Sequence, residues 1–249
     1  MADRVRESEL RFEGTVFNPD KLIGAESVKK DRGNRKKCML APKINDQKSE
    51  ITPELAKFKI NKTIPLVIEK NVLTALSFYP ELKNTTIRFC FKQRIRSSVM
   101  QAQPVFRTLL KRRANRQYQI NISAMFKLTH TAIPIHHIPD AIMIGWIGHE
   151  LGHIMDYECR NNFGMVKFGI GYVFSANYIK KVERIADWYA VTHGLGKYLI
   201  ETKRFILDHA ELPQAYKDKI ARLYVSPEEI VEQVKKLEEE KLEKQKKAL

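Results

Sequence analysis

The stretch His149-Glu150-Leu151-Gly152-His153 spells HExxH, and it lies inside an apolar segment that predicts a buried helix. Residues four apart lie on one face of a helix, so His149 and His153 can direct imidazole nitrogens at a single metal ion. Glu150 lies on a neighbouring edge of the same helix, where it can reach a metal-bound water without binding the metal itself. The spacing therefore indicates a catalytic zinc site.

A catalytic zinc ion takes three protein ligands and leaves a fourth position for water. We expect the third ligand on a second helix, predicted over residues 178–192, because this helix carries Glu183 four residues before Asp187. Asp187 can then accept a hydrogen bond from the far ring nitrogen of a ligand histidine and fix the orientation and tautomer of that ring. Glu183 is thus the predicted third ligand.

Glu183-Arg184-Ile185-Ala186-Asp187 also reads as ExxAD. The HExxH stretch followed by ExxAD resembles the signature of the gluzincin zinc metallopeptidases, whose better-known members are the thermolysin-type, CAAX-protease-type and ImmA/IrrE-type peptidases. The similarity is to soluble relatives of the last two types, because the CAAX-type enzymes are embedded in membranes and this sequence shows no membrane span. It extends over roughly residues 63–195.

This resemblance implies that zinc is held by His149, His153 and Glu183. It also implies that Glu150 is the general base, which takes a proton from the zinc-bound water and passes it to the leaving amine. Asp187 would support a ligand histidine from behind. The predicted function is that of a zinc-dependent endopeptidase, a hydrolase of protein or peptide bonds.

A further hydrogen-bond donor often stabilises the oxyanion that forms during such a reaction. The candidates in this sequence are Tyr172, Tyr178, Tyr189 and His193, and spacing alone does not choose among them. We favour His193 as a catalytic residue because it follows closely after the helix that carries Glu183.

The net charge of the 249-residue chain is +15, and its distribution is uneven. Between Glu81 and Asp140 there are eleven Lys and Arg residues and no acidic residue. Such a positive field attracts anionic partners, so we expect a preference for acidic protein or peptide substrates. An alternative is a nucleic-acid-associated protein or protease whose basic region 82–139 binds DNA or RNA, with peptidase activity secondary or absent. A second alternative is that the basic residues only form a solvated hairpin that binds no partner.

The predicted fold class is α+β and zincin-like, with a small mixed sheet, an exposed edge strand, a metal-binding helix and a helical C-terminal half. Hydrophobic periodicity predicts a helix over residues 63–79 and strands over residues 86–92 and 117–123. We expect the strand 117–123 to be the exposed edge that pairs with an extended substrate. The predicted domains are a basic, poorly structured arm (1–55), the peptidase domain (56–225) and a charged C-terminal helix (226–249).

Cys38, Cys90 and Cys159 are too few and too scattered to indicate a disulfide framework or a cysteine metal site. The sequence has no signal-peptide pattern and no apolar stretch of the roughly 20 residues that a membrane helix needs. We therefore expect a cytoplasmic protein with no membrane partner. The oligomeric state is not indicated.

Overall fold

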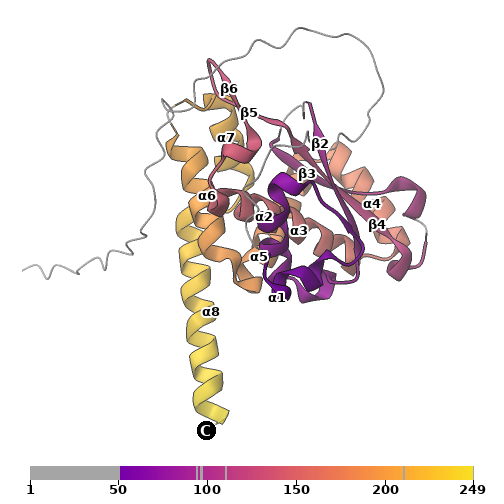
Figure 1. Ribbon diagram of the computed structural model, residues 1–249. Coiled ribbons are helices and arrows are strands. Elements are labelled where there is room, and N and C mark those ends of the chain that lie inside the picture. The colour runs from indigo at the N-terminus through magenta and orange to yellow at the C-terminus, as the bar shows by residue number, and fades with distance from the viewer. Residues whose placement is uncertain (1–50, 94, 96–97, 110, 210, 249) are drawn as a thin grey trace, which may run out of the picture. The chain divides into compact units, whose positions relative to one another are not determined.

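The computed structural model describes residues 51–93, 95, 98–109, 111–209 and 211–248. The predicted arm over residues 1–55 therefore lies almost wholly outside the described part. In that part, a small sheet is followed by a helical C-terminal half (Figure 1), which confirms the predicted α+β class. No helix among the described residues is long and apolar enough to cross a membrane.

The sheet-forming half begins with a short helix and contains two small sheets. Its elements are α1 (Pro53–Ala56), β1 (Lys62–Thr63), α2 (Glu69–Ser77), β2 (Thr86–Lys92), β3 (Met100–Pro104), β4 (Gln117–Ser123), β5 (Met125–Lys127) and β6 (Ala132–Pro134). Short 3-10 turns lie between them at Lys57–Lys59 (η2), Leu66–Ile68 (η3), Pro80–Leu82 (η4), Phe106–Thr108 (η5), Arg113–Asn115 (η6) and Ile135–His137 (η7). The predicted helix over residues 63–79 is shorter than expected, since a strand and a turn occupy its first part.

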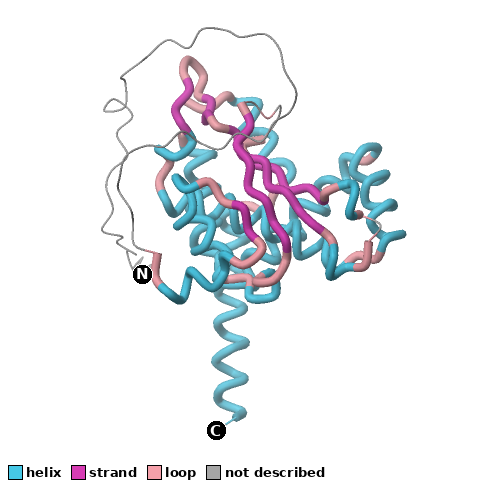
Figure 2. The backbone as a smooth tube through the Cα atoms, turned by 45° about the vertical axis from the view of Figure 1, so that its right-hand side comes forward, coloured by secondary structure: helices cyan, strands magenta, loops and turns pink. Residues whose placement is uncertain are grey.

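The helical half follows without further strands among the described residues. It consists of α3 (Asp140–Cys159), α4 (Asn162–Phe174), α5 (Ala176–Ala190), a π-helical turn η8 (Val191–Leu195), α6 (Gly196–Asp208), α7 (Gln214–Leu223) and α8 (Pro227–Ala248). Figure 2 shows the strands grouped on one side of these helices.

The main sheet is mixed and has the strand order β1-β2-β4-β3. The strand β2 pairs in parallel with both β1 and β4, whereas β3 runs antiparallel to β4. Because β4 is paired on both sides, the expectation that residues 117–123 form the exposed edge is wrong. The edge strand on that side is β3, which is not among the strands predicted from the sequence.

The residues of β3 alternate between buried and exposed. Met100 and Ala102 are buried and alternate with the exposed Gln101 and Gln103, as expected of a strand with one covered face. Pro104 ends this strand and has no N–H to donate to a hydrogen-bonded ladder. An edge strand tolerates proline where the missing N–H would face away from its neighbour.

Helix α3 lies at the centre of the structure and contacts α2, α5, α6 and β3. It is buried on all sides over most of its length, as expected of a helix with apolar residues around its whole circumference. Gly152 allows α5 to approach very closely, because a Cβ atom there would lie 2.5 Å from the backbone oxygen of Ala186. This close contact sets α5, and with it Glu183, against the two histidines.

The chain turns sharply after α5 at Gly194, whose φ of 90° lies in the left-handed region that favours glycine. Farther on, Ser226 and Glu229 form a capping box at the start of α8. The Ser226 N–H donates to the Glu229 carboxylate at 3.0 Å, and the Glu229 N–H donates to the Ser226 hydroxyl at 3.2 Å. Beyond Leu237 the described residues of α8 are exposed.

The two cysteines in the described part of the chain are in different states. Cys90, buried in β2, is disulfide-bonded, while Cys159 is an exposed free thiol. One disulfide-bonded cysteine among the described residues does not amount to a disulfide framework, which the sequence does not indicate either.

Candidate metal centre

Three buried side chains from two helices converge at the centre of the helical half. His149 and His153 lie one turn apart on α3, and Glu183 lies on the adjacent α5. The Oε2 atom of Glu183 is 3.1 Å from Nε2 of His149 and 3.4 Å from Nε2 of His153. The potential ligand atoms all lie within 4.8 Å of one another, so the group could hold a metal ion.

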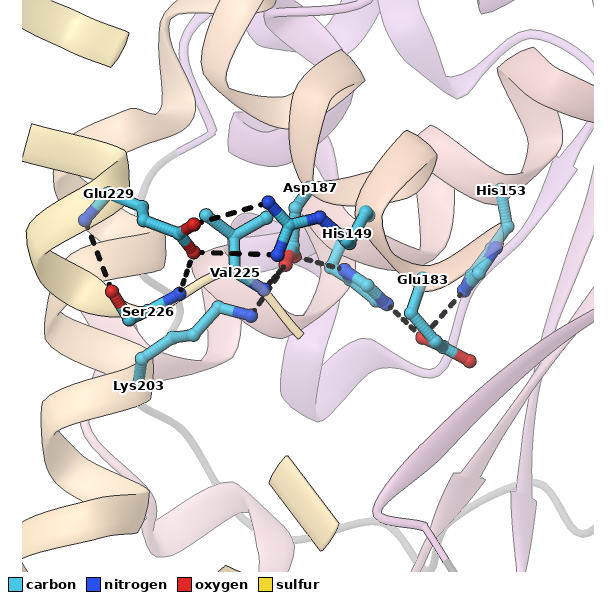
Figure 3. A network of polar contacts seen from close by, with 9 residues as sticks. His149, His153, Glu183, Asp187, Lys203, Val225, Ser226 and Glu229 are labelled. Atoms are coloured by element: carbon cyan, nitrogen blue, oxygen red, sulfur yellow. Dashed lines mark hydrogen bonds and ion pairs between the residues drawn. The ribbon is translucent and has the colours of Figure 1, made fainter. Parts of the chain in front are cut away.

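Asp187 supports one of these histidines from behind, as Figure 3 shows. Its Oδ1 atom lies 2.8 Å from Nδ1 of His149, and its Oδ2 atom accepts from the Lys203 ammonium at 2.7 Å. The backbone N–H of Val225 also donates to Oδ2, at 3.0 Å. Because Asp187 engages Nδ1, the Nε2 atom of His149 is left to face Glu183.

The second histidine is held differently. Nδ1 of His153 is buried and has no hydrogen-bond partner among the described residues. Its ring packs against two other rings, with the centroid of Tyr157 at 6.3 Å and that of His149 at 4.7 Å. His153 is therefore oriented by this packing and by the Glu183 carboxylate at its Nε2 atom, without a carboxylate behind the ring.

The electrostatics of the group are dominated by carboxylates. Burial alone would lower the pKa of His149, but its hydrogen bonds with Asp187 and Glu183 raise it to about 10. Burial would raise the pKa of Glu183, yet the neighbouring His153 and His149 hold it well below its usual range. The pKa of Asp187 is also lowered, because Lys203 and His149 outweigh the effect of burial. A cation at the centre would meet ionised oxygen donors.

Glu150 is buried beside the triad and contacts the edge strand. Its Oε2 atom accepts a hydrogen bond from the backbone N–H of Ala102 in β3 at 2.5 Å. Burial raises the pKa of Glu150, and the nearby His153 and His149 oppose that shift. The outer edge of β3 and the acid of the HExxH motif thus face each other.

A cavity of about 210 Å³ opens between β3, α3 and α4. Glu150, His153 and Glu183 line part of it. The remaining lining comes from β3 and its approach, from aromatic side chains and from one cation: Ser98, Met100, Gln101, Ala102, Gln103, Pro104, Tyr157, Phe168, Tyr172, Lys219 and Tyr224. We call this cavity the cleft.

The structure does not bring His193 into the group formed by the triad and Glu150. The ring of His193 stacks on Tyr79 with centroids 4.6 Å apart, and its Nδ1 atom lies 2.8 Å from the backbone oxygen of Tyr189. Its Nε2 atom is 3.4 Å from a carboxylate oxygen of Glu81. Of the other predicted oxyanion donors, Tyr172 lines the cleft.

Sequence reasoning missed several residues at this centre. Lys203 left a signal, because a charged residue stands between Leu199 and Ile206 on the buried face of α6. Tyr224, whose ring centroid lies 5.3 Å from that of His149, left none, since a loop residue has no periodicity to interpret. The contact from Ala102 was equally hidden, because it is made by the backbone.

The residues present fit a divalent transition metal. Two imidazoles and a carboxylate are the donor set of catalytic zinc sites, and the tautomer of His149 is set by Asp187 in the way that such sites require. Comparisons with protein-family models, curated proteins and solved structures found no match to this chain. The conclusion therefore depends on geometry: a buried His–His–Glu group on two helices, consistent with a zincin-like HExxH…E site.

Proposed function

We propose that this chain is a zinc-dependent endopeptidase in which His149, His153 and Glu183 hold the metal. The observation that carries the proposal is the convergence of these three buried side chains, two of which line the cleft together with Glu150. When bound, zinc polarises the scissile carbonyl group and lowers the pKa of a coordinated water to about 7.

Glu150 is the general base in this proposal. Its carboxylate takes a proton from the attacking water and delivers it to the leaving amine. Burial raises the pKa of Glu150, which makes its carboxylate a stronger base than an exposed one, although His153 and His149 oppose the shift. The Ala102 N–H, which donates to this carboxylate, holds it at the cleft.

The substrate main chain is proposed to pair with the outer edge of β3. In an antiparallel pair, residues alternate between those that bond to the neighbouring strand and those that point away from it. The N–H of Ala102 points to Glu150 and therefore away from β4, and Met100, two residues earlier, shares this orientation. At Ala102 the N–H is engaged by Glu150 and the C=O by the Tyr157 hydroxyl, so an extended peptide would pair with this edge at Met100 and run past Glu150.

Preference for acidic substrates stays part of the proposal, and one residue of the cleft favours it. Lys219 is a cation that lines the cleft, where it would attract an acidic side chain of the substrate. The exposed basic residues Lys111, Arg112 and Arg113 lie in the connection between β3 and β4, where they add to the positive field.

The oxyanion donor can be identified by substitution. Burial raises the pKa values of Tyr172 and Tyr224, so both phenols remain protonated donors at neutral pH. A loss of about 100-fold in kcat with unchanged metal content in Tyr172→Phe or Tyr224→Phe would identify the donor. The same loss in His193→Gln would instead support the assignment made from sequence.

The central test combines metal analysis with hydrolysis of an unfolded protein substrate. Purified protein should carry about one zinc ion per chain and lose hydrolysis when a chelator removes it. Glu150→Gln should retain zinc and lose hydrolysis, whereas Glu239→Gln, on the exposed part of α8, should retain both. Full hydrolysis by Glu150→Gln with zinc bound would refute the mechanism.

A further inference from the structure

Helix α4 exposes an apolar stripe on its outer face. The exposed fractions are 79% for Phe163, 46% for Val166, 58% for Ile170 and 82% for Phe174. These positions are three and four residues apart, so they form one row along the helix. A contiguous row of large apolar side chains in water marks a surface that binds something.

The opposite face of α4 already has a role within the protein. Met165 and Phe168 are buried, and Phe168 together with Tyr172 lines the cleft. Helix α4 is thus apolar on two opposite faces, and the described part of the chain covers one of them.

The surroundings of the stripe are basic. The sequence has no acidic residue between Glu158 and Glu183, while Lys167 is exposed on α4 beside the stripe. The start of α4 is also tied to the basic connection between β3 and β4. Arg116 is buried there and donates to the backbone oxygen of Arg160 at 2.7 Å and to the side chain of Asn162 at 2.6 Å. Figures 1 and 2 both show this connection beside α4.

The connection itself presents the same chemistry as the stripe. Phe106 is 86% exposed, and its neighbour Arg107 is exposed as well. Lys111, Arg112 and Arg113 are also exposed. Large apolar side chains and positive charges therefore occur together on both segments.

We propose that α4 and the connection between β3 and β4 form a surface that binds anionic lipid bilayers. The apolar part enters the boundary between headgroups and acyl chains, and the basic part meets the negative headgroups. We call it the lipid-binding surface, and it consists of Phe106, Arg107, Lys111, Arg112, Arg113, Phe163, Val166, Lys167, Ile170 and Phe174. Attachment is to the surface of the bilayer, so it requires no membrane-spanning helix and replaces the expectation of no membrane partner.

The composition of this surface favours lipid over other partners. Nucleic acid would use aromatic rings that stack on bases, but Val166 and Ile170 in the middle of the stripe have no ring. A second copy of the chain would bring like charges together, since both surfaces would be basic. An anionic bilayer matches both the apolar row and the positive charge around it.

Attachment would place the cleft close to the membrane, because Phe168 and Tyr172 line it from the other face of the same helix. If the proposed peptidase function holds, the substrates would then include protein segments adjacent to a bilayer. Lipid binding itself does not depend on that function.

The test is flotation of the full-length protein with vesicles, measured with the Glu150→Gln variant so that hydrolysis plays no part. Vesicles containing phosphatidylglycerol and phosphatidylcholine should bind the protein at least tenfold more tightly than vesicles of phosphatidylcholine alone. Replacing Phe163 and Ile170 together by Ser should weaken binding at least tenfold. Equal binding to both vesicle types, or unchanged binding by this double variant, would overturn the proposal.

Matched controls distinguish binding through the lipid-binding surface from nonspecific hydrophobic adsorption and from nonspecific electrostatic attraction. Leu66→Ser changes a side chain that is 77% exposed in η3, and it should leave vesicle binding unchanged. Replacing Lys111, Arg112 and Arg113 by Gln should weaken binding more than replacing Lys241, Lys244 and Lys247 on α8. Circular dichroism melting of each variant checks folding. A different outcome would overturn the proposal. If the unsubstituted surface binds no vesicles but supports a concentration-dependent dimer, and the Phe163 and Ile170 double variant loses that dimer, the surface binds a second copy of the chain instead.

Discussion

Helix α4 joins α3 to α5 in the chain but differs from both. The candidate functional side chains of α3 and α5 contact other parts of the protein, whereas one face of α4 is left exposed. At the site, α3 and α5 bury His149, Glu183 and Asp187 in direct polar contact with one another or with Lys203. Helix α4 carries none of the proposed ligands and exposes four large apolar side chains. Charges are buried where the chain itself supplies their partners. On our proposal, apolar side chains are exposed where the partner is a bilayer.

The largest expected effect comes from breaking the buried contacts at Asp187. Asp187→Asn leaves the ammonium of Lys203, which is 4% exposed, without its counter-charge. We expect the free energy of unfolding to fall by about 3 kcal/mol or more, and zinc affinity to fall roughly 10- to 100-fold. Urea denaturation and competition with a zinc-binding dye measure the two effects. Asp208→Asn, at an exposed position of α6, should change neither; equal effects in both variants would contradict the assignment.

Alanine substitutions of two glycines, Gly152 on α3 and Gly169 on α4, test whether α3 is closely packed where α4 is open. Gly152→Ala would force a Cβ atom against the backbone of Ala186, and we expect a loss of about 1–3 kcal/mol in stability together with weaker metal binding. Gly169→Ala on α4 meets nothing within 4 Å among the described residues, so it should be neutral or stabilise by up to about 1 kcal/mol. Thermal unfolding with and without zinc measures both. Similar losses in the two variants would show that α3 and α5 are not closely packed.

Metal binding should depend on pH through His149. The carboxylates around this imidazole raise its pKa to about 10 in the metal-free protein, so zinc must displace a proton at neutral pH. The contact of protonated His149 with the Asp187 and Glu183 carboxylates stabilises the metal-free fold fully below about pH 6.5. This contribution is lost as pH rises through about 10. Zinc affinity should therefore rise with pH, up to about tenfold per unit for one proton. Calorimetry in buffers of different ionisation enthalpy should show about one proton released per zinc; an enthalpy independent of buffer would contradict this.

The smallest expected effects concern helix caps. The hydroxyl of Ser226 caps α8, and the side chain of Asn161 caps α4 by accepting from the Gly164 N–H at 2.7 Å. Ser226→Ala and Asn161→Ala should each lower the free energy of unfolding by about 1 kcal/mol. Because Val225 N–H donates to Asp187, only Ser226→Ala should also weaken zinc binding. Equal zinc affinity in the two variants would show that the cap of α8 does not affect the position of Asp187.

Much of the fold could be predicted from local patterns. The strands 86–92 and 117–123, the central helix and the capping box at Ser226 follow from periodicity and spacing over a few residues, which depend on nearby chain geometry. The strand Met100–Pro104 is harder to predict, because only Met100 and Ala102 alternate as buried residues and its other positions are glutamines and a proline. The role of strand 117–123 was assigned wrongly, because strand order depends on pairing between distant segments.

The sequence by itself determined that His149 and His153 lie on one face of a helix with Glu150 beside them. It also determined that Glu183 and Asp187 lie one turn apart on a later helix. One turn of helix is enough to place such residues relative to each other. Only the tertiary structure decided that Lys203 and the backbone of Val225 hold Asp187, that Ala102 meets Glu150, and that one face of α4 stays uncovered. These facts depend on how whole elements pack, because contacts between segments far apart in the chain leave no periodic trace within either segment.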